Sequence, residues 1–450
     1  MKIFYNGKCI KAVLEGKVME SKSKGMLIAK YKFDKSICDN LIPEFNTKFT
    51  NYEIVDEYLD TEDITTISTE TILMFNSDSK PDEHGVLTTE YEVETPVLIN
   101  AGDIVTRSIY SNELPTKMTF GYDQDTSYSN ATIASSLLSV ISINCSKLVN
   151  GYRMFKDCSN LTSINCNWNQ CRLKHHIGMF QNCKSLIDAN FESLITSDSI
   201  NIASIFAGCH SLTEINTNGW DTINVKDMSN AFNTCKSLIS LDVSNFNTSK
   251  VTNMGAMFYS CSNLTSLDVS NFNTSNVTTM EEMFYRCSNL TSIDVSNWNT
   301  SNVTNMYQMF YYCQLLTSLD VSNFDTSNVT NMNGMFNSCN NLTSLDVSNF
   351  DTSKVTNMQG MFFDCRSLTE LDLSNWNTNK VTNMNFMFYN CALLSKIIMN
   401  NSDYSSVNKI ITQLPTRTSD SKGTLNIAGI DNISQVDTTT VQSKYWNIVV

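Results

Sequence analysis

Apolar and polar residues alternate with two different periods inside a segment that recurs along most of the chain. The clearest copy spans residues 264–287. In its first half, Leu267 and Val269 alternate with polar residues, and Asp268 lies between them. This period-two pattern is typical of a short strand with one buried and one exposed face, so we predict one strand in each copy.

The second half of the copy has the spacing of a helix. Val277, Met280, Phe284 and Cys287 recur at intervals that place them along one stripe of a short helix. Thr274 belongs to the residue types that cap the start of a helix. Each copy is therefore predicted to contain a strand followed by a short helix.

A cysteine near the end of each copy marks the length of the repeat. The spacing is 25 residues once and 26 residues thereafter, between Cys158, Cys183, Cys209, Cys235, Cys261, Cys287, Cys313, Cys339, Cys365 and Cys391. One strand and a short helix cannot bury this much apolar surface alone, so the copies must stack on one another. The predicted fold is an α/β solenoid, a leucine-rich-repeat array of about ten 26-residue coils at residues 146–400.

The repeat resembles the bacterial leucine-rich repeats called BspA-like. The residues that carry the resemblance are the leucines, valine and asparagine of 264–271, the Val-Thr-Asn-Met run at 251–254 and the Met-Phe-x-x-Cys ending at 283–287. The resemblance covers residues 150–400. It implies surface recognition, namely adhesion to proteins, cells or glycans, without catalysis.

The two ends of the chain depart from the repeat. Segments 26–33 and 64–75 are typical of strands, which predicts a β-rich N-terminal domain over residues 1–145. The stretch 103–121 resembles segments that precede such repeats in proteins encoded by phages and prophages of gut bacteria, which implies docking to a virion structural protein. Residues 401–450 lose the period and are predicted to form a capping segment, with a loop at 414–418.

Composition and charge exclude several classes of partner. The chain has 45 acidic and 31 basic residues, a formal net charge of -14, and no long basic run. Nucleic-acid binding is therefore not expected. No window of about 18 uninterrupted apolar residues occurs, so we expect neither membrane insertion nor a secretory start.

A column of acidic residues is predicted on the outward face of the strands, on the concave side of the array. Its members are Asp242, Asp268, Asp294, Asp320, Asp346 and Asp372. Strands lie about 4.8 Å apart, so neighbouring carboxylates repel by roughly 1 kcal/mol in water. Either calcium or a ligand with regularly spaced hydroxyls bridges them, or flanking Ser and Thr hydroxyls and water satisfy them. Otherwise no cofactor is predicted.

A second candidate surface lies where the repeat varies most. Glu281, Glu282, Tyr285, Arg286 and their counterparts are predicted to share the outward, convex side. The ligand-binding candidates there are Tyr259, Tyr285, Tyr311, Tyr312 and Tyr389. Such an aromatic ridge can stack on sugars or anchor a protein partner. The alternative is an ordinary surface on which tyrosines lean on their neighbours.

No constellation for catalysis or metal binding stands out. The repeated cysteines fit buried thiols that pack as small hydrophobes, although adjacent coils are within disulfide range. Cys166, Cys171, His175 and His176 form a ligand-like cluster, but their spacing matches no standard zinc motif. We therefore predict no metal site, and no enzyme, because identical repeated carboxylates cannot supply an acid and a base with unlike environments.

The resulting prediction is a non-enzymatic recognition protein. The leading hypothesis is a phage virion appendage whose array binds a host-surface glycan or protein and whose N-terminal domain docks to the particle. The alternatives are a bacterial or protist surface adhesin exported by a non-classical route, located on the bacterial cell surface, and an intracellular interaction scaffold. A homo-oligomer is compatible with each of these hypotheses.

Overall fold

The structure is a computed structural model. It describes residues 149–450 apart from 196, 401, 402 and 431, and before residue 149 it describes the strands alone. The chain divides into two compact units, Met1–Ser199 and Ile200–Val450. The predicted boundary at residue 145 stays a prediction.

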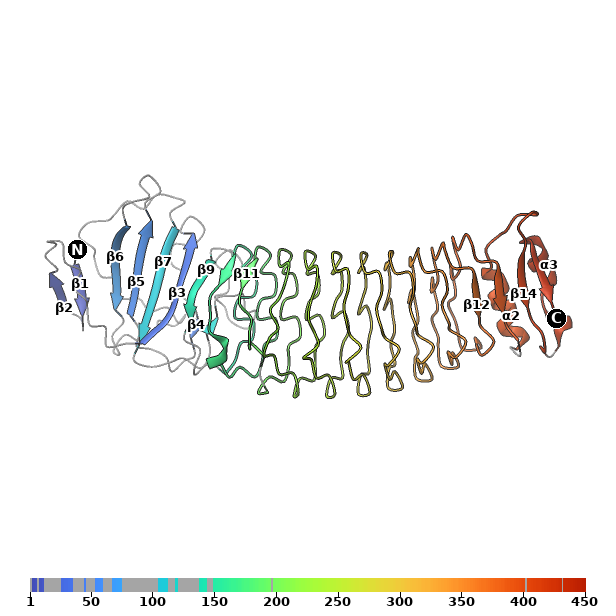
Figure 1. Cartoon of the computed structure of the whole chain (residues 1–450), viewed down its shortest axis with the longest axis horizontal. Helices are drawn as coiled ribbons and strands as arrows, with labels where there is room; N and C mark the ends of the chain where they lie inside the picture. The colour runs from blue at the N-terminus through green and yellow to red at the C-terminus, as the bar shows by residue number, and fades with distance from the viewer. Residues whose placement is uncertain are drawn as a thin grey trace. The chain divides into compact units, whose positions relative to one another are not determined.

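The first unit contains a seven-stranded sheet in the order β11-β10-β9-β3-β7-β5-β6 (Figure 1). Its strands are β3 (Met26–Asp34), β5 (Glu53–Leu59), β6 (Ile67–Met74), β7 (Ile104–Ser111), β9 (Leu137–Ile143), β10 (Ser163–Ile164) and β11 (Asp188–Ala189). Two small pairs accompany it, β1 (Lys2–Tyr5) with β2 (Lys8–Lys11) and β4 (Glu44–Phe45) with β8 (Met118–Thr119). Strands β3 and β6 correspond to the two segments predicted from the sequence.

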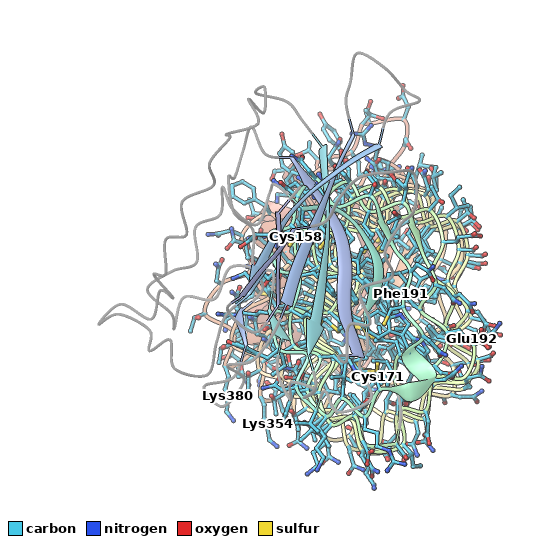
Figure 2. All side chains as sticks on the ribbon, turned by 90° about the vertical axis from the view of Figure 1, so that its left-hand side faces the viewer. Cys158, Cys171, Phe191, Glu192, Lys354 and Lys380 are labelled. Carbon is cyan, nitrogen blue, oxygen red and sulfur yellow. The ribbon has the colours of Figure 1, made fainter. Side chains whose placement is uncertain are left out.

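Strand β9 marks a change of direction within this sheet. It pairs antiparallel with β3 but parallel with β10, and β10 pairs parallel with β11. A 3-10 helix, η1 (Trp168–Gln170), follows β10. Alternation separates the interior from the surface, because Phe191 is buried while the adjacent Glu192 is exposed (Figure 2). Parallel stacking thus begins before the first cysteine of the repeat.

The second unit is a stack of leucine-rich coils held by parallel contacts between equivalent residues. Isolated parallel bridges link Asn253 to Thr279 and Thr279 to Asn305, one repeat apart each time. Leu267 and Val269 are buried and Asp268 is exposed, as predicted. Within the second unit, the first regular strand at this position is β12 (Glu370–Asp372), whereas β10 and β11 occupy the equivalent position in the first unit.

The second half of each coil is not helical, and the predicted short helix is wrong. Apart from η1, the described residues between 149 and 400 contain no helix. The N–H groups of Glu282 and Phe284 donate to the carbonyls of Tyr307 and Met309 in the next coil, at 2.8 and 2.9 Å. The N–H of Met283, which lies between them, donates within its own coil to the Met280 carbonyl, at 3.3 Å. Donors therefore alternate between the two coils, which a helix cannot do because all its bonds stay within the helix.

This backbone path requires left-handed residues at two positions of each coil. Glu282 has φ 55° and Arg286 has φ 56°, and the equivalent positions of other coils behave alike. A left-handed residue at the third position of a four-residue turn is the mark of a type II turn. Successive turns of this kind still direct Met280, Met283 and Phe284 inward, so the sequence pattern identified the buried positions but not the backbone conformation.

Aromatic rings form a continuous stack through the interior of the second unit. Phe284 is fully buried, and its ring centroid lies 5.6 Å from that of Phe258 and 5.5 Å from that of Phe310. The stack continues at equivalent positions from Phe206 to Phe388. Thr274 is also buried, and its hydroxyl donates to the Asn299 carbonyl at 2.9 Å instead of capping a helix. Each coil therefore depends on its neighbours for both packing and hydrogen bonding.

Residues after 400 extend the stack with helices and longer strands. Strands β12, β13 (Lys396–Ile398), β14 (Gly423–Asn426) and β15 (Trp446–Val449) form a parallel sheet in chain order. Between them lie α2 (Tyr404–Gln413), η2 (Ile433–Gln435) and α3 (Thr438–Ser443). The Asp403 side chain caps α2 by accepting from the Ser406 N–H at 2.9 Å. Strand β15 lies at one edge of this sheet. The capping role of residues 401–450 stays a prediction.

Candidate functional site

The aspartate column is present, and each carboxylate is engaged within its own coil. Asp268 Oδ1 accepts from the Ser270 N–H at 3.0 Å and from the Ser270 hydroxyl at 2.6 Å. The same backbone bond forms at Asp242, Asp294, Asp320, Asp346 and Asp372. The serine two residues on lowers the pKa of Asp242, Asp268 and Asp320 below the ordinary value. The column is thus a series of side-chain-stabilised turns, which agrees with the serine interpretation.

The column does not gather the ligands that a metal would need. Among the described residues, no group of three or more His, Cys, Asp or Glu side chains could hold a metal ion. Each coil contributes one aspartate to the column, and one of its oxygens is already occupied by two donors. Calcium usually takes six to eight oxygen ligands. A calcium ion at the column would therefore need further oxygen ligands from a bound partner, and calcium binding stays a prediction.

Three tyrosines at equivalent positions form a stack on the surface of the second unit. The ring centroids of Tyr259 and Tyr285 are 4.4 Å apart, with an interplanar angle of 6°. Those of Tyr285 and Tyr311 are 4.8 Å apart, with an angle of 9°. We call these three residues the tyrosine ridge. This stacking covers the ring faces between neighbouring tyrosines.

Charged residues flank the tyrosine ridge. The Arg286 guanidinium lies 5.5 Å from the ring centroids of both Tyr285 and Tyr312, within range of a cation–π interaction. Burial, followed by the charge of Glu281, raises the pKa of Glu282 above its ordinary value. Asn305 donates to the Glu281 carboxylate. The ridge is therefore bordered by two acidic groups and one basic group. The residue types at these three positions differ from coil to coil.

The ridge does not extend over all five predicted tyrosines. Tyr312 is exposed, and its ring centroid lies 6.3 Å from that of Tyr311, so it lies next to the end of the ridge. Tyr389 lies three coils beyond Tyr311, and the position between them in the next coil is held by Asn337. Tyr389 stacks instead on Phe363, at 5.0 Å. The variable positions face outward as predicted, but their aromatic residues fall into two separate groups.

The cysteine column consists of free, buried thiols, as predicted. Cys287 is fully buried, and its Sγ lies 3.1 Å from the Phe258 carbonyl oxygen. Burial raises the pKa of the Cys287 thiol well above its ordinary value. Within the ligand-like cluster, Cys171 is disulfide-bonded and His176 is fully buried. Burial lowers the pKa of His176 to about 3, so its imidazole is neutral in the folded chain near neutral pH.

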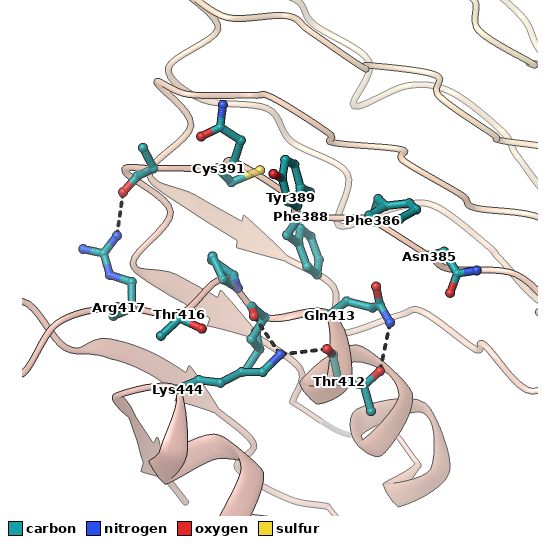
Figure 3. Close-up of a pocket in the computed structure, with 14 residues that line it drawn as sticks. Asn385, Phe386, Phe388, Tyr389, Cys391, Thr412, Gln413, Thr416, Arg417 and Lys444 are labelled. Carbon is teal, nitrogen blue, oxygen red and sulfur yellow. Dashed lines mark hydrogen bonds between the residues drawn. The ribbon is translucent and has the colours of Figure 1, made fainter.

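A pocket that sequence reasoning missed lies where the last coils meet the residues after 400 (Figure 3). It encloses about 560 Å³. The side chains that give it chemical character are Asn385, Phe386, Tyr389, Gln413, Arg417 and Lys444. We call it the C-terminal pocket. Its lining comes from residues 385–392, residues 412–417 and Lys444, which are distant in sequence, so no local pattern could have revealed it.

No helix among the described residues is long and apolar enough to cross a membrane.

Comparison with solved structures gives 21 matching chains, and the two described here have low identity to this chain. The mouse RP105/MD-1 complex matches with 16% identity over 72% of this chain and 53% of that chain, at a TM-score of 0.28. The TLR13–ssRNA13 complex matches with 15% identity over 68% of this chain and 55% of that chain, at a TM-score of 0.24. The chain therefore spans about half the length of these solved chains. No curated protein matches the sequence.

A family model described as "Mycoplasma protein of unknown function, DUF285" matches residues 134–215, 200–319 and 315–422. The three matches overlap and together cover more than half of the chain. They include the aspartate column and the tyrosine ridge. By this match, the chain belongs to the family described as Mycoplasma protein of unknown function, DUF285.

Proposed function

We propose that this chain is a non-enzymatic recognition protein that binds a partner protein through the tyrosine ridge. The observation that carries the proposal is the face-to-face stacking of Tyr259, Tyr285 and Tyr311 at 4.4 and 4.8 Å. Stacking orders the side chains before binding, which reduces the entropy lost when a partner docks. Ordered tyrosines flanked by an arginine have the composition of protein-interaction hot spots.

The exposed parts of the ridge favour a protein over a sugar as the partner. Stacking on a sugar needs an open ring face, but each face between neighbouring tyrosines is already covered. Burial raises the pKa of Tyr259 and Tyr311 above the ordinary value, so both keep their hydroxyl proton at neutral pH. The ridge therefore offers a row of hydroxyl donors and ring edges, which suits a polypeptide with backbone carbonyls and apolar side chains.

Several features support a binding role without catalysis. The six column aspartates repeat in nearly identical surroundings, whereas acid–base catalysis needs two groups held in unlike environments. The repeat keeps its interior constant and varies at the positions of Glu281, Glu282, Tyr285 and Arg286. A constant interior with a variable exterior is how repeat proteins build distinct binding surfaces on one scaffold.

The setting of this recognition is part of the same proposal. We place the array on a phage particle, as a BspA-like virion appendage docked through its N-terminal residues, with a bacterial or protist surface adhesin as the alternative. Detection of the chain in purified virions by mass spectrometry would support the first setting, and its detection only on the surface of bacterial cells would favour the second.

The binding proposal is tested with the full chain and a ridge variant. Arrays of bacterial envelope proteins and of glycans are probed with the full chain, with and without calcium. We expect saturable binding to a protein that falls more than tenfold in the Tyr285→Ala/Tyr311→Ala double variant. The control is Asn337→Ala, which alters the same position of the next coil outside the stack.

Two outcomes would overturn the proposal. The first is binding that survives loss of the two ridge tyrosines. The second is binding that is lost in Asp268→Ala/Asp294→Ala and depends on calcium, which would move recognition to the aspartate column. A circular dichroism spectrum and a urea unfolding midpoint for each variant ensure that weaker binding does not reflect unfolding.

A further inference from the structure

We propose that the C-terminal pocket binds a carboxylate-bearing sugar residue of an acidic glycan. The pocket lies on different coils from the tyrosine ridge, and the inference does not depend on the function proposed for that ridge. Three observations carry it: an exposed aromatic wall, two cations without an acidic partner in the lining, and amide side chains in the same lining (Figure 3).

The aromatic wall is formed by Phe386 and Tyr389. These side chains are 57% and 58% exposed, respectively, which is unusual for large aromatic residues in this array. Their ring centroids are 6.0 Å apart and the rings are nearly perpendicular, at 87°. The two rings therefore do not stack on each other. One face of Tyr389 lies against Phe363, at 5.0 Å between ring centroids, but most of both side chains is exposed. An open ring face is what the apolar face of a sugar stacks on.

Phe386 also occupies a backbone position where a large side chain is costly. Its φ is 62°, in the left-handed region, and the equivalent position in the two preceding coils is held by Gly334 and Gly360. This region is unfavourable for an L-residue because its Cβ comes too close to the backbone. The last regular coil thus places an exposed aromatic residue where its neighbours use glycine, which points to a contact made by Phe386 beyond the fold itself.

Two cations provide the positive charge of the pocket. Lys444 Nζ donates to the carbonyls of Thr412 and Leu414, at 2.7 and 2.9 Å. Arg417 Nη1 donates to the Ala392 carbonyl at 2.7 Å, and its other bonds go to Ser421. An ammonium has three donors and a guanidinium has five, so both groups keep N–H donors in reserve.

No carboxylate offsets these charges within the pocket. The residues that line it include no Asp or Glu. In a chain with a net charge of -14, such a place is a local exception that attracts anions. The hydrogen bonds to backbone carbonyls hold both cations in the lining, and an anion can accept from the N–H groups that these bonds leave unused.

The amides and the size of the pocket distinguish a sugar from a simple anion. Asn385 and Gln413 each present a donor and an acceptor, which matches adjacent hydroxyl groups. A volume of about 560 Å³ lies in the range of small-molecule sites and exceeds what an inorganic ion fills. A carboxylate, a set of hydroxyls and one apolar face occur together in sugar acids, and this pocket offers a partner for each.

The test measures binding of defined sugars to the full chain by isothermal titration calorimetry. The probes are N-acetylneuraminic acid and glucuronic acid, with glucose as the neutral comparison and inorganic phosphate as the anion without a sugar. We expect the two acids to bind at least tenfold more tightly than glucose and phosphate, and their affinity to fall as salt rises.

The key variant is Phe386→Gly, which places in this coil the residue that two preceding coils already use. It should fold normally and weaken binding of the acids at least tenfold. Lys444→Gln should also weaken the acids while leaving glucose unchanged. Leu393→Ala, an exposed apolar residue in the same coil that does not line the pocket, is the matched control and should bind like the original chain.

The proposal is wrong if neither acid binds, if phosphate or an acidic peptide competes as well as the sugar acids, or if Phe386→Gly and Lys444→Gln both bind normally. Urea midpoints for the variants distinguish loss of the pocket from loss of the fold.

Discussion

The left-handed turn positions allow a test that separates the observed coil from a helix by the sign of one effect. Ala256 has φ 53° and lies at the same position as Gly360, which has φ 57°. In a helix, replacing alanine by glycine destabilises the fold by about 1 kcal/mol. In the left-handed region the alanine itself is unfavourable by about 1–2 kcal/mol, while glycine costs about 0.5–1 kcal/mol in chain entropy. Ala256→Gly should therefore stabilise the chain by about 0.5–1 kcal/mol.

The reciprocal change provides an internal check. Gly360→Ala should destabilise the chain by about 1 kcal/mol, because the new Cβ would lie 3.3 Å from the Asn337 side chain on a left-handed backbone. Gly255→Ala is the matched control, since Gly255 is adjacent to Ala256 but lacks the left-handed conformation. Its Cβ would lie 3.3 Å from Asn253 Oδ1, so we expect a change within about 0.5 kcal/mol.

The assay is urea unfolding of the full chain followed by circular dichroism. Hydrogen exchange of peptides covering residues 250–290 assigns the change to the second unit. A triple variant, Ala256→Gly/Glu282→Gly/Gln308→Gly, should stabilise the chain by about 1.5–3 kcal/mol if the three sites add. Destabilisation by Ala256→Gly, together with stabilisation by Gly360→Ala, would refute the turn conformation and restore the helix predicted from the sequence.

Three further predictions concern the interior. Because burial lowers the folded-state pKa of His176 from 6.5 to about 3, the unfolded chain binds a proton first as pH falls. Stability should then decrease by about 1.4 kcal/mol per pH unit between 6.5 and 3, and a His176→Leu variant should show a shallower pH profile of the urea midpoint. Native Cys287 should resist iodoacetamide because its buried thiol has a raised pKa, and it should react once urea unfolds the chain; rapid native labelling would contradict this. Phe284→Ala should lower the free energy of unfolding by about 3–5 kcal/mol. The loss should exceed that of Phe388→Ala by about 1 kcal/mol, because Phe284 stacks on two phenylalanines and Phe388 on one. Equal urea midpoints for the two variants would argue against ring stacking as a separate contribution.

The candidate sites were only partly predictable from the sequence. The outward positions of Asp268 and Tyr285 follow from their place between buried residues, and the structure confirms both. The interruption of the ridge at Asn337 is also visible in the sequence once equivalent positions are aligned. Ring stacking at 4.4 and 4.8 Å is not, because it depends on how far apart the coils lie and how the side chains turn. The preference for a protein at the ridge therefore came from geometry.

The sequence by itself determined the repeat length, the buried residues and the column positions. Equivalent residues recur every 26 positions, and a stack places equivalent residues in contact whatever backbone path joins them. Only the tertiary structure decided that the backbone of the second half of each coil consists of turns, because a spacing of three and four apolar residues fits turns as well as a helix. The deciding observation is that the N–H groups of Glu282 and Phe284 donate to the next coil. The C-terminal pocket was likewise decided by tertiary structure, since Phe386, Arg417 and Lys444 are distant in sequence and meet only after the last coils pack against the residues that follow them.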